Sequence, residues 1–190
     1  MARVYGLKTQ LAKNGIDEPT IKAIIGNGDL VDVTTRMESL LDADTMQRAL
    51  DACGCSGGSA FIAHCKKIGK ALAGQSLSEK IDHLNNNVFR TEHIALEGDG
   101  LLRGTLVFEE NGKHRCVCSA VIKKGLIVAD LTGDADARVM PLAYCYCCAG
   151  SFRRHLQLQL GVELRTREII SSPIHSKGEQ PCAFVFALME

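Results

Sequence analysis

Apolar residues of this chain recur at two different spacings, and the change falls near residue 95. In the first part they recur every three or four positions, the period of an α-helix with one buried face. Glycines typical of helix ends separate these stretches. The pattern predicts helices over about residues 19–25, 35–52, 59–73 and 76–87.

Beyond residue 95, apolar and polar residues alternate, as they do in a strand with one buried face. Between the first two predicted strands lies Asn111-Gly112, a dipeptide that favours the positive φ angles of a tight hairpin turn. A long helix is expected after Pro141 and should end at Gly161. The four predicted strands span residues 101–109, 114–122, 162–172 and 182–188.

This ββαββ order predicts an α+β fold. One helix would cover a face of a four-stranded antiparallel sheet, and the N-terminal helical region would pack on what remains apolar. We divide the chain into a helical region, residues 1–95, and an α+β domain, residues 96–190. A chain of 190 residues is expected to fold these two parts into one compact body.

Charge and hydropathy narrow the class of protein. The 22 basic and 22 acidic residues cancel, so no net field draws the chain to nucleic acid or to anionic lipid. No apolar run approaches the roughly 20 residues that cross a bilayer. The first residues, MARVYGLKTQLAKNG, lack the apolar stretch of a secretory signal. We therefore expect a cytoplasmic protein that binds neither nucleic acid nor membrane.

Cysteine is the unusual component, with nine residues in the chain. An odd number without a secretory signal fits reduced thiols or metal ligands better than a disulfide framework. Cys65 lies on the apolar stripe of its predicted helix and is expected to be a buried core thiol. Cys53 and Cys55 fall at a glycine-rich break between two predicted helices, where the sequence does not decide their role.

Cys116 and Cys118 stand two apart on a predicted strand, so both side chains leave the same face, about 6.5 to 7 Å apart. His114 shares that face. The three side chains could supply ligands to a tetrahedral zinc ion if a loop let them converge. Ala120 and Ile122 extend the same face, so packing of small residues against the core explains the pair equally well.

A second cluster, Cys145, Cys147 and Cys148, lies at the start of the predicted long helix. On a regular helix Cys145 and Cys148 share a face, whereas Cys147 points the other way. The exposed amides and positive dipole end of a helix start would stabilise thiolates. This position favours metal binding or redox chemistry, and Cys182, at the start of the last predicted strand, could add a ligand.

The C-terminal half also resembles a known family, the 4-vinyl reductase type small-molecule-binding domain, also called the predicted hydrocarbon-binding domain. The resemblance covers about residues 100–190. Cys116 and Cys118, with the stretch from Met46 through Cys53 and Gly54, are similar to its cysteine-rich bacterial members. The points of contact are Cys145, Cys147, Ala149, Gly150, Gly161, Val162, Glu163, Ser172, Gly178, Cys182 and Phe184.

The resemblance implies an α+β fold with an antiparallel sheet, a pocket between sheet and helices, frequent dimerisation and, in cysteine-bearing members, a metal site. It implies no reaction, because the superfamily includes both ligand sensors and sequences labelled as L-2-amino-thiazoline-4-carboxylic acid hydrolase.

We therefore expect a cytoplasmic small-molecule-binding or sensing protein with a cysteine-ligated zinc beside an apolar pocket. Its ligand would be small and apolar or amphipathic, and the protein could form a homodimer. The alternative is a metal- or thiol-dependent hydrolase of a small cyclic substrate, with His114 or Glu163 as the base. A third interpretation makes the cysteines core filler of an oligomerisation module. The expected zinc ligands are Cys116, Cys118, Cys145 and Cys147, with Cys148 or Cys182 as substitutes.

Overall fold

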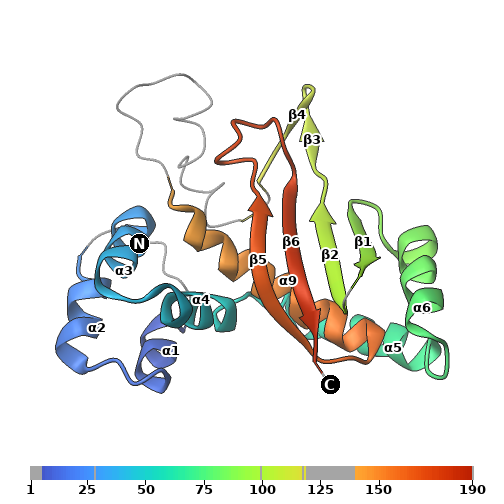
Figure 1. The fold of residues 1–190 in the computed structure, drawn as a ribbon, viewed down its shortest axis with the longest axis horizontal. Helices are drawn as coiled ribbons and strands as arrows, with labels where there is room; N and C mark the ends of the chain where they lie inside the picture. Colours follow the sequence, from blue (N-terminus) through green and yellow to red (C-terminus); the bar gives the residue numbers. More distant parts are fainter. Residues whose placement is uncertain (1–5, 28, 99, 117, 119–139, 190) are drawn as a thin grey trace.

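A computed structural model of the chain describes residues 6–27, 29–98, 100–116, 118 and 140–189 (Figure 1). Helices come first along the chain, and strands flank the long C-terminal helix. The α-helices of these residues are α1 (Leu7–Lys13), α2 (Glu18–Ile25), α3 (Leu30–Leu40), α4 (Ala43–Ala52), α5 (Ser59–Ala71), α6 (Leu77–His83) and α9 (Cys145–Leu160). A π-helical turn, η1 (Leu84–Val88), continues α6, and a 3-10 turn, η2 (Leu142–Tyr144), precedes α9.

The predicted helix over 35–52 is wrong as a single element, because it is interrupted at Leu41 and Asp42. Asp42 adopts an extended backbone, with φ −68° and ψ 156°, and its carboxylate accepts a hydrogen bond of 2.9 Å from the Thr45 amide. An aspartate in this position satisfies a free amide of a helix start, so it begins α4 as a separate helix. The other predicted N-terminal helices correspond to α2, α5 and α6 with η1.

Four strands form an antiparallel sheet in the order β1-β2-β6-β5. The sheet includes one strand that the sequence reading did not predict, β1, which pairs with β2 from Glu92↔Leu106 to Glu97↔Leu101. The fold is therefore α+β, with the expected number and direction of sheet strands. The strands are β1 (Glu92–Glu97), β2 (Leu101–Leu106), β5 (Leu164–Ser171) and β6 (Cys182–Leu188).

The predicted Asn111-Gly112 turn is present, but it closes a separate ribbon. Both residues have positive φ, 54° and 76°, and they join β3 (Glu109–Glu110) to β4 (Lys113–His114). The ribbon projects beyond the end of the sheet (Figure 1). The described residues Cys116 and Cys118 of the predicted strand 114–122 lie outside any strand, and residues 117 and 119–122 lie outside the described residues.

The long helix α9 packs against both the sheet and the N-terminal helices. It begins after Pro141 and ends at Gly161, whose φ of 70° is the left-handed conformation that favours glycine, as predicted. Figure 1 shows α9 running behind the sheet, and it contacts β5 as well as α4 and α5. Its Phe152 packs with Phe184 and Phe186 of β6 in the main hydrophobic core.

The helices α1 to α4 enclose a second core. Leu11, Ile24 and Met37 are fully buried in it, and Ala143 of η2 joins it from the C-terminal half. The segment that leads into α9 therefore touches both parts of the chain. Within the part of the chain that the structure describes, no helix has the length and apolar character needed to span a membrane.

Candidate metal centre

Cysteines from four segments meet around the first turns of α9. Three belong to α9 itself, Cys182 is the first residue of β6, and Cys116 and Cys118 follow β4. Cys53 caps the end of α4, and Cys55 stands in the loop that leads to α5. The ninth, Cys65, is fully buried on α5, as predicted.

On the sheet side of α9, Cys145 and Cys148 form one group with Cys182. The Cys145 thiol lies 3.4 Å from the Ser172 hydroxyl oxygen at the end of β5, and the Cys148 and Cys182 thiols hydrogen-bond to each other. Burial is the main cause that raises the pKa of Cys116, and charges on Cys118, Cys148 and Cys145 would raise it further. The predicted shared face of Cys145 and Cys148 is thus the face that meets the sheet.

Cys147 belongs to a different group, as the spacing on a helix requires. Its sulfur lies 3.6 Å from the carbonyl oxygen of Cys53, on the side of α9 that faces the end of α4. After burial, the influences that raise the pKa of Cys147 are the thiols of Cys118, Cys53, Cys148 and Cys55. Cys147 therefore faces Cys53 and Cys55, whose role could not be decided from the sequence.

Cys118 packs close to the start of α9. Its sulfur is 3.2 Å from the hydroxyl oxygen of Tyr144, the residue before α9. A negative charge on Cys118 would raise the pKa of Cys145 and Cys148 on one side and of Cys147 on the other. Eight of the nine cysteines consequently form one continuous neighbourhood around the start of α9.

Burial sets the protonation state of these thiols. Loss of water raises the pKa of Cys53 to about 11 and those of Cys116 and Cys145 to about 12, and it also raises the pKa of Cys147. A hydrogen bond with Cys182, together with burial, raises the pKa of Cys148. A buried charge without a partner is costly, so these groups are neutral thiols at pH 7 without a counter-charge.

The thiols make weak hydrogen bonds in this arrangement. Among the described residues, no three His, Cys, Asp or Glu side chains stand in a geometry that would hold a metal. Cysteine has a single side-chain torsion before its sulfur, and rotation between staggered rotamers moves that sulfur by about 3 Å. A change of rotamer would therefore redirect the sulfurs that hydrogen-bond to Ser172, Tyr144 and the Cys53 carbonyl, with the backbone in place.

The sequence left the role of Cys53 and Cys55 undecided, because their position beside α9 depends on close contact between two backbones. A Cβ on Gly54 would lie 2.6 Å from the carbonyl carbon of Gly150, and one on Gly150 would collide with the carbonyl oxygen of Asp51. Only glycine fits at either position. The sequence signal was present in Cys-Gly-Cys and in the Ala-Gly of α9, but nothing local says that the two glycines meet.

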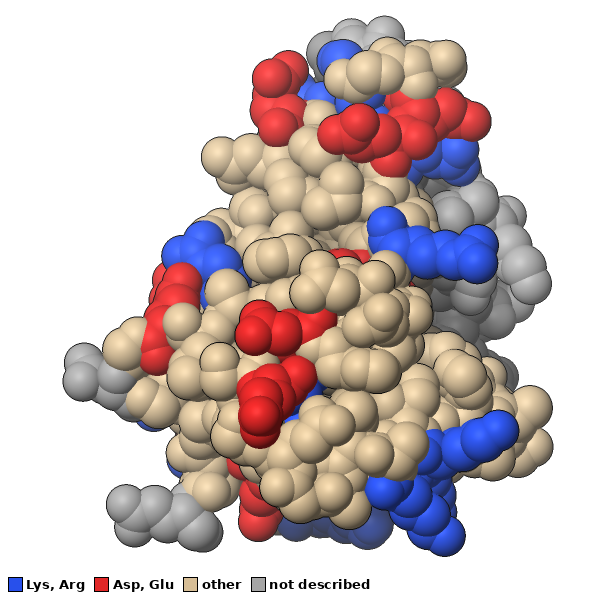
Figure 2. Space-filling model, turned by 90° about the vertical axis from the view of Figure 1, so that its right-hand side faces the viewer, with Lys and Arg blue, Asp and Glu red and all other residues tan. Residues whose placement is uncertain are grey.

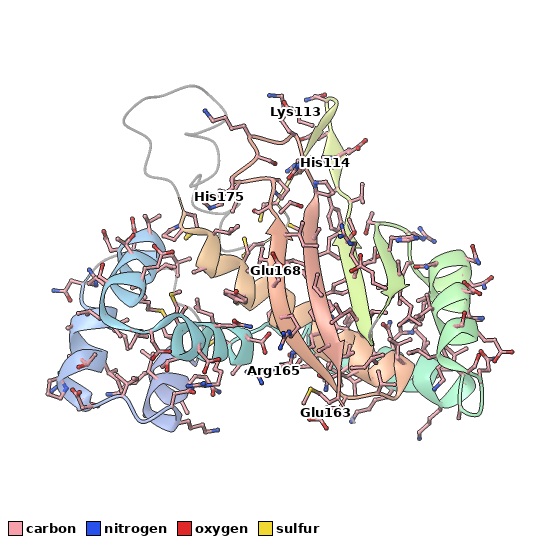
Figure 3. The ribbon with its side chains drawn as sticks, in the orientation of Figure 1. Lys113, His114, Glu163, Arg165, Glu168 and His175 are labelled. Carbon is pink, nitrogen blue, oxygen red and sulfur yellow. The ribbon has the colours of Figure 1, made fainter. Side chains whose placement is uncertain are left out.

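The predicted general bases do not meet each other. Glu163 lies at the opposite end of the sheet from His114, as Figure 3 shows. His114 belongs to β4, and its Nδ1 lies 3.6 Å from the Glu109 carboxylate. Nε2 of His175 lies 2.8 Å from the carbonyl oxygen of Met140.

Arg153 does not lie on a solvated face of α9. Its Nη2 donates a 2.6 Å hydrogen bond to Oδ2 of Asp51, and Nη1 donates to the Leu164 carbonyl at 3.1 Å. His155 likewise packs against the ring of Phe61, with ring centroids 4.7 Å apart. These basic residues are structural contacts between α9, α4 and α5.

Comparison of the chain with protein-family models, curated proteins and solved structures found no match. The resemblance to the hydrocarbon-binding domain therefore stays an expectation from the sequence.

Proposed function

We propose that this protein is a small-molecule-binding or sensing protein that carries a cysteine-ligated zinc ion at the start of α9. The observation that supports the proposal is the meeting of cysteines from three remote segments on the sheet side of that helix. In this proposal Cys145, Cys148 and Cys182 supply three ligands from the sheet side of α9, and Cys116 supplies the fourth. Cys147, expected earlier as a ligand of the same ion, points to the other side of the helix.

The chemistry of the group supports zinc. Thiolates are the ligands of structural zinc, which takes four of them in a tetrahedron. Burial raises the pKa of Cys116 and of Cys145 to about 12, so a bound cation would supply the positive charge that their thiolates need. Binding of zinc contributes an apparent 10 to 16 kcal/mol in small peptides, roughly the stability of a whole domain.

The proposed ligand is small and apolar or amphipathic. This part of the proposal rests on the resemblance of residues 100–190 to the hydrocarbon-binding domain and on the apolar character of the layer between α9 and the sheet. Both signs of charge are spread over the face seen in Figure 2, which gives that face no bias toward a polyanionic ligand. A sensor would couple ligand in this layer to the zinc through α9, which contributes to both.

A thiol-dependent hydrolase has less support. A nucleophilic cysteine acts as the thiolate, and burial raises the pKa of the α9 thiols instead of lowering it. Glu163, one of the two candidate bases, lies at the far end of the sheet (Figure 3). A metal-dependent hydrolase would need a coordination position open to water beside these ligands.

Metal analysis of the full chain tests the proposal. The protein should be expressed without a histidine tag, purified under reducing conditions and measured for zinc and protein together. We expect at least one zinc per chain, and we expect Cys145→Ser with Cys182→Ser to reduce it. The matched control is Cys65→Ser, which changes a buried cysteine on α5 outside the cluster. Less than about 0.2 zinc per chain, with all thiols titrating freely, would refute the zinc site.

A further inference from the structure

We propose that Cys55 is a modification site, a nucleophilic thiol that reacts with a low-molecular-weight disulfide to form a mixed disulfide. Ser151 stabilises its thiolate, and His155 receives its proton. The inference goes beyond the proposed function, because Cys55 is not among the proposed zinc ligands. All nine cysteines are among the described residues, and Cys55 alone is exposed. A small reagent in solution therefore reaches this thiol first.

One face of α9 holds the loop that carries Cys55. Ser151 and His155 are four residues apart on the helix, so they share that face. The Ser151 hydroxyl donates to the Cys55 carbonyl oxygen at 2.6 Å, and Nε2 of His155 lies 3.0 Å from the carbonyl oxygen of Ser56. At Gly54 the backbones are so close that a Cβ would collide with the Ser151 amide nitrogen. The thiol is therefore held beside a hydroxyl and close to an imidazole.

The hydrogen bonds of Ser151 decide which group donates to which. A serine hydroxyl has one hydrogen, and the bond of 2.6 Å uses it for the Cys55 carbonyl oxygen. The Cys55 sulfur lies 3.4 Å from the same hydroxyl oxygen, so the thiol is the donor in that contact. When the thiol loses its proton, the hydroxyl can turn its hydrogen to the sulfur and stabilise the thiolate.

His155 is in the protonation state of a base. A carbonyl oxygen only accepts hydrogen bonds, so Nε2 donates to Ser56 and Nδ1 of the neutral ring is left to accept a proton. Burial is the main cause that lowers the pKa of His155, which keeps the ring neutral at pH 7. Arg154 and Glu92 also act on the ring, in opposite directions.

The reaction is a thiol–disulfide exchange. The Cys55 thiol gives its proton to His155, and its sulfur attacks one sulfur of the small disulfide. A new S–S bond joins Cys55 to one half of the reagent, while the S–S bond of the reagent breaks. The other half leaves with the bonding electron pair and takes the proton from His155, which makes it a free thiol. Cys55 is oxidised and the leaving sulfur is reduced, so the small disulfide is the only oxidant.

Glutathione disulfide is the probe that tests the site. The full chain is reduced, freed of reductant and mixed with the probe at pH 7, and peptide mass spectrometry follows the mixed disulfide at each cysteine. We expect Cys55 to react first, and at least about tenfold faster than the same thiol in the urea-unfolded chain. Ser151→Ala and His155→Asn should each remove most of this excess.

The matched control is His64→Asn, which should keep the rate. His64 is an exposed histidine on α5 whose ring centroid lies 6.5 Å from that of Phe61, the ring that also contacts His155. Ser151→Thr keeps a hydroxyl at the helix surface and should restore the reactivity that Ser151→Ala loses. Circular dichroism of each variant separates a loss of reactivity from a loss of fold.

Three results would overturn the inference. They are a Cys55 that reacts no faster in the folded than in the unfolded chain, a first reaction at another cysteine, and an unchanged rate in folded Ser151→Ala and His155→Asn. The zinc content of the same samples is measured separately. A chain without zinc whose Cys55 reacts as expected overturns the zinc proposal alone, and a zinc-bearing chain with an unreactive Cys55 overturns only this inference.

Discussion

The guanidinium of Arg153 on α9 lies 2.6 Å from the carboxylate of Asp51, in the last turn of α4. The other carboxylate oxygen of Asp51 accepts a hydrogen bond from the Thr166 hydroxyl on β5. Gln47 Nε2 donates to the Thr166 carbonyl at 2.8 Å, so α4, α9 and β5 are joined at one place. Because Asp51 is two residues before Cys53, this junction also positions the cysteine loop.

Removal of Asp51 should destabilise the protein measurably. Asp51→Ala leaves a half-buried Arg153 without its partner and frees the Thr166 hydroxyl, which should cost about 2 to 3 kcal/mol of unfolding free energy. Urea denaturation at pH 7 measures the change. The control is Glu18→Ala, which removes the exposed pair with Lys8 and should cost less than about 0.5 kcal/mol. Equal effects of the two substitutions would contradict the structural role of Asp51.

Because α9 lies very close to the end of α4, a single methyl group added at Gly150 should destabilise the protein strongly. A Cβ at Gly150 would collide with the Asp51 carbonyl, so Gly150→Ala should force the two segments apart. We expect a loss of about 2 to 4 kcal/mol of unfolding free energy. Gly98→Ala is the matched control, since a Cβ there meets no atom within 4 Å. A neutral Gly150→Ala would mean that the segments are not in contact.

Metal binding should release protons in a number that reports the ligands. The pKa of Cys116 and that of Cys145 are raised to about 12 by burial, so both thiols are protonated at pH 7.5 and must lose their protons to bind zinc. Addition of zinc to metal-free protein in weak buffer should release about four protons per ion. Affinity should accordingly fall as the pH is lowered. Release of about one proton per ion would argue against a four-thiolate site.

We expect His155 to make the stability of the folded protein decrease at acid pH. Burial is the main cause that lowers its pKa below the usual 6.5, and the nearby Arg154 adds to the effect. Its charged form is therefore disfavoured in the folded state, so its contribution to stability is complete above pH 6.5 and is lost as pH falls. Between pH 7.5 and pH 5, the unfolding free energy from urea denaturation should fall less in His155→Asn than in the unchanged protein. The two losses should differ by less than about 1 kcal/mol. His93→Asn, on an exposed position of β1, should behave like the unchanged protein.

The features that depend only on neighbouring residues could be predicted from the sequence. The Asn111-Gly112 turn, the end of α9 at Gly161 and the shared face of Cys145 and Cys148 all follow from backbone preferences or helical period, and all are present in the structure. The interruption between α3 and α4 also has a local cause, the cap at Asp42, but the apolar stripe continues across it and hides it. The burial of Cys65 follows from the same stripe on α5.

Local patterns along the chain are therefore enough to predict the class of fold, the long helix and the thiols at its start. Three relationships are visible only in the folded chain: β1 lies beside β2, Arg153 pairs with Asp51, and Cys53 and Cys55 stand beside Cys147. They could not be predicted because they depend on contacts between distant segments. Cys55 and Ser151 are 96 positions apart, and their contact exists because Gly54 and Gly150 let two backbones touch.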